Sequence, residues 1–162
     1  MKTLMIFGLA MMLCSTVSSF AQKVLSEGTI TYNIVIQTNN KEPQMADALD
    51  GATSTVYLKG GLSRTSMLSA LGVESTIHNT QTGNAVILKE YSGQKLMITL
   101  TKNDWAAKNK KYEGAVFEPT GETATIAGYN CLKAIAKLKD GSSFTVYYTT
   151  DINLINKEYD QT

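Results

Sequence analysis

The stretch from Thr120 to Thr150 constrains the fold most, because apolar and polar residues alternate on both sides of an Asp-Gly pair. Alternation with a period of two is typical of a β-strand that turns one face to a core. Asp-Gly between two such runs is a strong turn signal. The stretch therefore predicts a long strand, a turn at Asp140-Gly141 and a second strand.

The length of this turn decides which side chains share a face. A two-residue loop would set Lys137 opposite Phe144 and divide the apolar residues between the two faces. A three-residue loop (139–141), with a β-bulge and Gly141 in the left-handed conformation, unites them on one face. We therefore predict that Leu138 pairs with Ser142, Ala136 with Phe144, Ala134 with Val146, and Leu132 with Tyr148. Cys131, Lys133 and Lys137 then lie on the opposite face.

The preceding chain predicts more strands and two helical segments. The strands are expected at Gly28–Thr38, Thr53–Lys59, Leu62–Leu68, Val73–Thr80, Ala85–Tyr91 and Lys95–Thr101, with at most a short edge strand at Val116–Glu118. A three-residue loop, 92–94, would set Val86 and Leu88 against Leu100 and Ile98. Short helices are expected at Asn39–Gly51 and Asn103–Lys111, the second capped by Asn103 or Asp104 and anchored to the sheet by Trp105.

About eight strands in consecutive hairpins indicate an antiparallel meander. We therefore predict a mainly β (α+β) fold, with a curved antiparallel sheet or open half-barrel and two short helices. One apolar sheet face must be covered, either by closure of the sheet or by a helix.

The first 21 residues have the pattern of a signal peptide. Lys2 precedes the apolar run Leu4–Leu13, and Ser19-Phe20-Ala21 offers the small residues of a cleavage site. The run is too short to span a bilayer, which takes about 20 residues. We expect a signal peptide at 1–21, a single domain at 22–162 without a transmembrane segment, and a location in the periplasm or outside the cell.

The composition argues against catalysis and against nucleic-acid binding. The chain has 15 Lys and Arg against 14 Asp and Glu, so no basic excess indicates nucleic acid. His78 is the only histidine, which rules out a multi-histidine metal site, and we expect a solvated residue beside Glu74 and Thr76. Cys131 is the only thiol after residue 21, and we interpret it as a buried or half-buried strand residue. We predict no catalytic residue, metal or cofactor.

The apolar sheet face is the remaining candidate for function. Small residues on a curved sheet leave room for an acyl chain beside larger side chains. The ligand-facing candidates are Ile34, Leu88, Ile98, Ala134, Ala136, Phe144 and Val146. The alternative is an ordinary core filled by the two helices.

Several motifs also carry a resemblance to a known family. They are Pro119–Thr123, Ile126–Cys131 and Val146–Thr149, together with Gly28–Tyr32 and Val56–Gly60. The chain resembles a family of exported bacterial envelope proteins that is classed as a domain of unknown function and related in pattern to the GLPGLI family. The resemblance implies a fold similar to that of the LolA/LolB-like lipoprotein carriers, and implies no catalytic residues. The expected Gly-Leu-Pro stretch and further strands are absent before Thr162, so we expect a short form or an incomplete domain.

Two functional hypotheses follow. The first is an exported, non-catalytic binding domain that holds a lipid or a lipoprotein acyl chain against a concave apolar sheet face. The second is a structural or protein-interaction module of the cell envelope, with a filled core and an envelope protein as its partner.

Overall fold

The structure is a computed structural model that describes residues 23–37 and 45–156. Residues 1–22, 38–44 and 157–162 lie outside the described residues. They include the predicted signal peptide and residues 39–44 of the predicted helical segment 39–51. The described part is mainly β, and its two larger sheets are open and antiparallel, as predicted. It contains eleven strands in three sheets, where we expected about eight strands in one.

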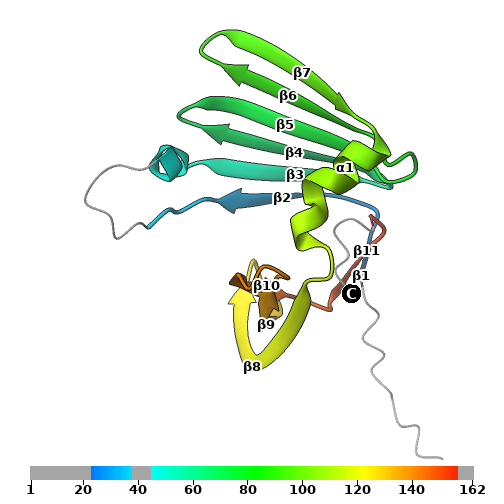
Figure 1. The fold of residues 1–162 in the computed structure, drawn as a ribbon. Coiled ribbons are helices and arrows are strands. Elements are labelled where there is room, and N and C mark those ends of the chain that lie inside the picture. Colours follow the sequence, from blue (N-terminus) through cyan, green and yellow to red (C-terminus); the bar gives the residue numbers. More distant parts are fainter. Residues whose placement is uncertain (1–22, 38–44, 157–162) are drawn as a thin grey trace, which may run out of the picture.

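The largest sheet is a six-stranded antiparallel meander (Figure 1). Its strands, in spatial and chain order, are β2 (Glu27–Asn33), β3 (Thr53–Lys59), β4 (Leu62–Ser69), β5 (Gly72–Asn79), β6 (Ala85–Tyr91) and β7 (Gln94–Leu100). The predicted strand ranges are confirmed here to within a few residues. Of the two predicted helices, the first is a 3-10 helix, η1 (Met45–Leu49). The second is α1 (Lys102–Asn109), continued by a 3-10 turn, η2 (Lys110–Tyr112).

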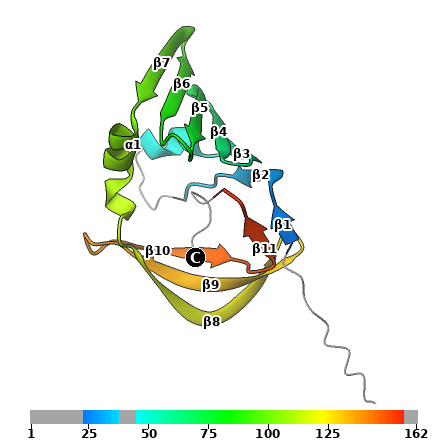
Figure 2. The ribbon, with the colours of Figure 1, turned by 90° about the vertical axis from the view of Figure 1, so that its right-hand side faces the viewer.

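The C-terminal part forms a second, three-stranded sheet in the order β10-β9-β8. Its strands are β8 (Val116–Ile126), β9 (Tyr129–Lys137) and β10 (Ser143–Tyr148). In Figure 2 this sheet lies opposite the six-stranded sheet, and α1 and η2 join the two on one side. On the other side, β1 (Lys23–Leu25) pairs in parallel with β11 (Ile152–Leu154). Segments that precede the first sheet and follow the second are thereby held together.

The predicted register of the C-terminal hairpin is confirmed. Ala136 pairs with Phe144 and Ala134 with Val146, and the Leu138 N–H donates to the Ser142 carbonyl at 2.9 Å. Gly141 has φ +85°, the left-handed conformation that the bulged turn requires.

The predicted long strand before this turn is wrong, because it is two strands. The chain reverses at Ala127-Gly128, where φ is +50° and +83°, and β8 then pairs with β9. The expected short edge strand at Val116–Glu118 is the start of β8, which continues through an irregularity between Pro119 and Thr123. Positive φ at both central positions is the mark of a type I′ turn, and Ala at the first of them gave no turn signal in the sequence.

The predicted register between β6 and β7 is also wrong. Ser92 and Gly93 have φ of +50° and +78° and form a two-residue type I′ turn, so Tyr91 pairs with Gln94. The expected three-residue loop would have shifted the pairing by one residue. Because side chains alternate, this difference moves Leu88 to the face opposite Ile98.

The register of the whole meander defines two different faces. We call one the helix-covered face; its buried residues are Val56, Leu58, Ser63, His78, Ala85 and Ile87. We call the other the Arg64 face; across the six strands it carries the row Thr29, Tyr57, Arg64, Ile77, Val86 and Thr99. The packed core of this sheet therefore lies on one side only.

Trp105 attaches α1 to the helix-covered face, as predicted. Its ring stacks on the imidazole of His78, with centroids 4.7 Å apart and planes inclined by 18°. The prediction of a solvated His78 is wrong, because only 7% of the residue is exposed. Its place beside Glu74 and Thr76 on one face is confirmed by the register.

The N-cap lies two residues before Asn103, the earlier of the two predicted caps. Thr101 is the N-cap, and its hydroxyl oxygen accepts from the Asp104 N–H at 3.3 Å, while the Asp104 carboxylate accepts from the Thr101 N–H at 3.0 Å. This is a capping box. The hydrogen bonds from Thr101 lower the pKa of Asp104. Asp104 is thus the third helical residue, which stabilises the cap from inside the helix.

The turn at Ala127 gives the first prediction. Ala127→Gly should raise the free energy of unfolding by about 1 kcal/mol, because a left-handed Ala is strained and Gly is not. Urea denaturation measures the change. Ala70→Gly, in the turn between β4 and β5, is the matched control: its φ is not positive, so this variant should be neutral or less stable. Equal effects of the two changes would contradict the turn assignment.

The stack on His78 gives the second prediction. Trp105→Ala should lower the free energy of unfolding by about 2–3 kcal/mol, because it removes the apolar contact that holds α1 to the sheet. Lys110→Ala, an exposed change just beyond the helix, should have little effect. If Trp105→Ala proves as mild as the control, the anchoring role is wrong.

Candidate functional site

Four of the predicted ligand-facing residues share one face of the three-stranded sheet. Ala136 lies between Phe117 and Phe144 on the neighbouring strands, and Ala134 lies between Pro119 and Val146. The two alanines are 0% and 1% exposed, so the space above them is filled. Phe117 and Phe144 remain 41% and 43% exposed. The exposed surface of this face thus comes from the larger side chains that flank the alanines.

The other three predicted residues belong to the six-stranded region and do not meet. The Ile34 N–H, just after β2, donates to the Ala52 carbonyl at 2.8 Å. Ile98 pairs with Ile87 on the helix-covered face, whereas Leu88 lies on the Arg64 face. The seven residues are thus divided among different surfaces.

The Arg64 face is the candidate binding surface that the structure offers instead. Large apolar side chains stay at least one-third exposed here, whereas on the opposite face Val56, Leu58 and Ile87 are buried. The exposed side chains are Tyr57, Leu62, Leu68, Val73, Ile77, Leu88 and Met97. A contiguous apolar surface of this kind marks a ligand or partner site more often than a random stretch of surface does.

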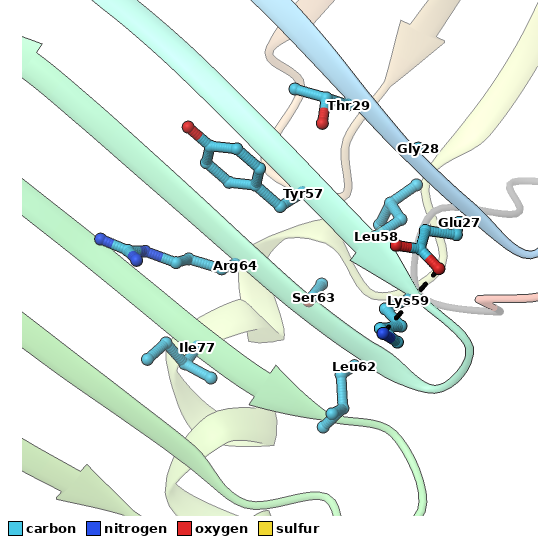
Figure 3. A pocket seen from close by; sticks show the side chains of 10 residues that line it. All are labelled: Glu27, Gly28, Thr29, Tyr57, Leu58, Lys59, Leu62, Ser63, Arg64 and Ile77. Carbon is cyan, nitrogen blue, oxygen red and sulfur yellow. Dashed lines mark ion pairs between the residues drawn. The ribbon is translucent and has the colours of Figure 1, made fainter.

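Two grooves are hollowed into the Arg64 face, each with a volume of about 370 Å³. The first crosses β2 to β5, where Tyr57, Arg64 and Ile77 project side by side from neighbouring strands (Figure 3). The second crosses β4 to β7, between Val73, Leu88 and Met97. Arg64 is the residue that lines both.

Arg64 is fixed at this junction by a short chain of hydroxyl groups. Its guanidinium donates to Ser75 Oγ at 3.3 Å, and Ser75 Oγ lies 2.9 Å from Ser66 Oγ. Ser75 is 3% exposed and lies beneath the arginine side chain. A guanidinium carries five N–H donors, so most remain available to a ligand.

The other cations of the six-stranded sheet are neutralised. The three lysines on its strands each form an ion pair with a glutamate: Lys59 with Glu27 at 3.9 Å, Lys89 with Glu74 at 2.8 Å, and Lys95 with Glu90 at 3.7 Å. Arg64 has no carboxylate within ion-pair distance among residues 23–37 and 45–156. It is also the only arginine in the sequence. An apolar face with one uncompensated guanidinium suits a ligand that is apolar and carries one negative charge.

The helix-covered face holds a charged cluster with a different character. The Tyr91 hydroxyl donates to Glu74 Oε2 at 2.9 Å, the oxygen that Lys89 Nζ contacts. Burial raises the pKa of Glu74, but the hydrogen bonds from Lys89 and Tyr91 and the Lys89 charge outweigh it, so the pKa lies below its ordinary value. The contact with Glu74 raises the pKa of Lys89. These groups satisfy one another, as in a structural ion pair.

The remaining candidates for chemistry lie apart. Cys131 is buried in β9, and its thiol donates to the Tyr129 carbonyl at 3.7 Å, so the interpretation as a buried strand thiol is confirmed. On that face Lys133 and Lys137 pair with Glu122 and Glu118. Within the described parts of the chain, no three His, Cys, Asp or Glu side chains come close enough together to hold a metal ion.

The family model of a domain of unknown function (DUF4412) matches residues 35–157. The chain belongs to this family. No curated protein and no solved structure matches the sequence or the fold. Across the described residues, no helix is both long and apolar enough to span a membrane.

Arg64 and Tyr57 were not predicted as site residues. They lie on a strand pair whose ranges the sequence predicted, but the alternation of residues 62–68 is weak, so it did not show which face was covered. The signal that was present is compositional: a chain with many lysines uses arginine once. Arginine differs from lysine in offering a planar fork of donors, which suits a carboxylate or phosphate.

The Glu74 cluster gives the third prediction. A lowered folded-state pKa contributes stability that is present above the unfolded value of about 4.5 and is lost as the pH falls through the folded value. Glu74→Gln should therefore cost about 1 kcal/mol of unfolding free energy at pH 7 and close to nothing at strongly acidic pH. Urea unfolding of the wild type and the variant across this pH range measures the difference in their unfolding free energies.

Glu90→Gln is the matched control for this experiment. Its ion pair with Lys95 is more exposed, with 55% and 77% of the two side chains accessible, and should contribute less than about 0.5 kcal/mol. A difference for Glu74→Gln that stayed constant with pH would show that the charge of Glu74 is not the source of stability.

Proposed function

We propose that the protein is an exported, non-catalytic binding domain that holds a single acyl chain with an anionic head group on its Arg64 face. The observation that carries the proposal is the position of Arg64. Among the strand cations of the six-stranded sheet, it is the one without a carboxylate partner in the described part of the chain. It lies between two grooves that are lined by apolar side chains and by ion-paired charged ones. The grooves supply contacts for hydrocarbon, and the guanidinium supplies the complementary charge.

The dimensions of the grooves support a small ligand. A volume of about 370 Å³ is near the lower end for small-molecule sites, which suits one chain rather than a lipid with several. Tyr57 and Ile77 flank Arg64 on the neighbouring strands, so their side chains lie beside a carboxylate or phosphate bound there. A bidentate arginine contact is stronger than a contact between neutral groups.

This proposal changes the surface that we expected from the sequence but keeps the class of ligand. The expected acyl-chain surface included Ala134 and Ala136, which are buried, and it joined Leu88 to Ile98, which lie on opposite faces of the six-stranded sheet. Of the seven expected residues, Leu88 lines one of the grooves. Export rests on the signal-peptide pattern at 1–21. The relation to the GLPGLI family and to the LolA/LolB-like carriers stays a prediction from the quoted motifs.

A protein-interaction module of the cell envelope is the second candidate. It is favoured by exposed apolar residues outside the first groove, such as Leu68 at 60% and Met97 at 72%. An envelope protein that covered these residues would bury them without any need for Arg64. The two candidates therefore differ in whether the guanidinium contributes to binding.

The fourth prediction tests this difference. The full protein, purified from the periplasm, should bind a fluorescent fatty acid, and Arg64→Gln should weaken binding about 10- to 100-fold, because a hydrogen bond to a charged group contributes roughly 1.5–3 kcal/mol. The methyl ester of the same fatty acid should bind both proteins equally. Lys137→Gln, on the other sheet, should leave both affinities unchanged.

Three results would overturn the proposal. Failure of the wild-type protein to bind the fatty acid would remove the acyl-chain function and favour the interaction module. Equal weakening of fatty acid and ester by Arg64→Gln would show that Arg64 does not recognise the charge of the head group. An unchanged affinity for the fatty acid would show that the head group lies elsewhere.

A further inference from the structure

The strand β7 ends the six-stranded sheet, and in the described part of the chain no strand pairs with its outer side. It is seven residues long, contains neither Pro nor Gly, and carries one charge, that of Lys95. Leu96, Met97 and Ile98 are 55%, 72% and 42% exposed. Monomeric proteins usually protect such an edge with charges, prolines or bulges, because it readily pairs with another strand.

The turn at Ser92-Gly93 determines which backbone groups of β7 remain unpaired. A two-residue hairpin turn is flanked by a pair that exchanges both hydrogen bonds, here Tyr91 with Gln94. Bonded pairs then recur at every second residue, so Gln94, Leu96, Ile98 and Leu100 bond to β6. The N–H and C=O groups of Lys95, Met97 and Thr99 point outward.

We propose that two copies of the protein pair antiparallel through β7, around a two-fold axis at Met97. In this register Met97 faces the Met97 of the second copy, and each Lys95 faces a Thr99. These are the residues with outward backbone groups, so each of the pairs exchanges two hydrogen bonds. Leu96 and Ile98 meet on the helix-covered side of the joint.

Charge selects this register over its neighbours. A two-fold axis at Lys95 would set two ammonium groups opposite each other, which is destabilising in a strand pair. An axis at Thr99 would move Lys95 past the end of the partner strand and lose its hydrogen bonds. The axis at Met97 uses every outward group and separates the two lysines. A symmetric, self-complementary pattern of this kind fits a second copy better than an unrelated peptide.

The pairing would extend the Arg64 face across two molecules. Met97 and Leu88 line the second groove on that face, so the grooves of the two copies would meet at the axis. This inference stands on the edge of β7 and does not depend on binding of an acyl chain.

The fifth prediction is a position-specific cross-link in the full-length exported protein. Directly opposed residues in a bonded antiparallel pair have Cα atoms about 5.5 Å apart, within the range of a disulfide. Met97→Cys should therefore give a covalent dimer on mild oxidation. Thr99→Cys is the matched control: it is on the same face of the same strand, but two such residues lie about 14 Å apart along the paired strands and should not cross-link.

Sedimentation velocity supplies the second measurement. The wild-type protein should sediment as a dimer, and Met97→Lys should make it a monomer, because it sets two ammonium groups opposite each other at the axis. Leu68→Lys, an exposed change on an interior strand of the same face, should leave the dimer intact. A monomeric wild type, a dimer that survives Met97→Lys, or equal cross-linking at positions 97 and 99 would each overturn the proposal.

Discussion

The register set by the hairpin turns is the constraint on which the functional surfaces depend. Side chains alternate along a strand, so one residue more or less in a turn exchanges the two faces of the strand that follows. The turn at Ser92-Gly93 has two residues, and this places Met97 and Leu88 on the Arg64 face and Ile98 on the opposite one. The same turn determines which backbone groups of β7 point outward.

The two faces of the six-stranded sheet differ because only one of them receives the helix. Stacking of Trp105 on His78 covers that face at the end where Leu58, Ser63 and Ala85 are buried. The polar groups farther along, Glu74 and Lys89, neutralise each other. The Arg64 face has no such cover among the described residues, although it also carries large apolar side chains. Burial on the helix-covered face is thus greatest at the end where Trp105 stacks, and the sequence alternation alone would have allowed either face to be the core.

The sequence predicted the position of most strands, because alternating runs ended by Gly-containing turns are strong local signals. It also predicted the register of the C-terminal hairpin, where a single loop length united the apolar residues. Two turns were misinterpreted for a shared reason. Ser92 and Ala127 adopt the left-handed conformation that is usual for Gly or Asn, so their residue types gave no indication of a type I′ turn. The parallel pairing of β1 with β11 joins segments at opposite ends of the chain, and no local pattern encodes such a contact.

The candidate site was harder to predict than the fold because it is defined by what is missing around a residue. Lys59, Lys89 and Lys95 resemble Arg64 in sequence as strand cations, but each has a glutamate nearby in space. Their partners come from a neighbouring strand in each case, so the pairing depends on register. Arg64 faces Tyr57 and Ile77 across the strands and donates to a buried hydroxyl group instead. An arginine between an aromatic and an aliphatic neighbour gains little electrostatic stabilisation within the fold, whereas an anionic ligand there would gain both a charge partner and an apolar surface.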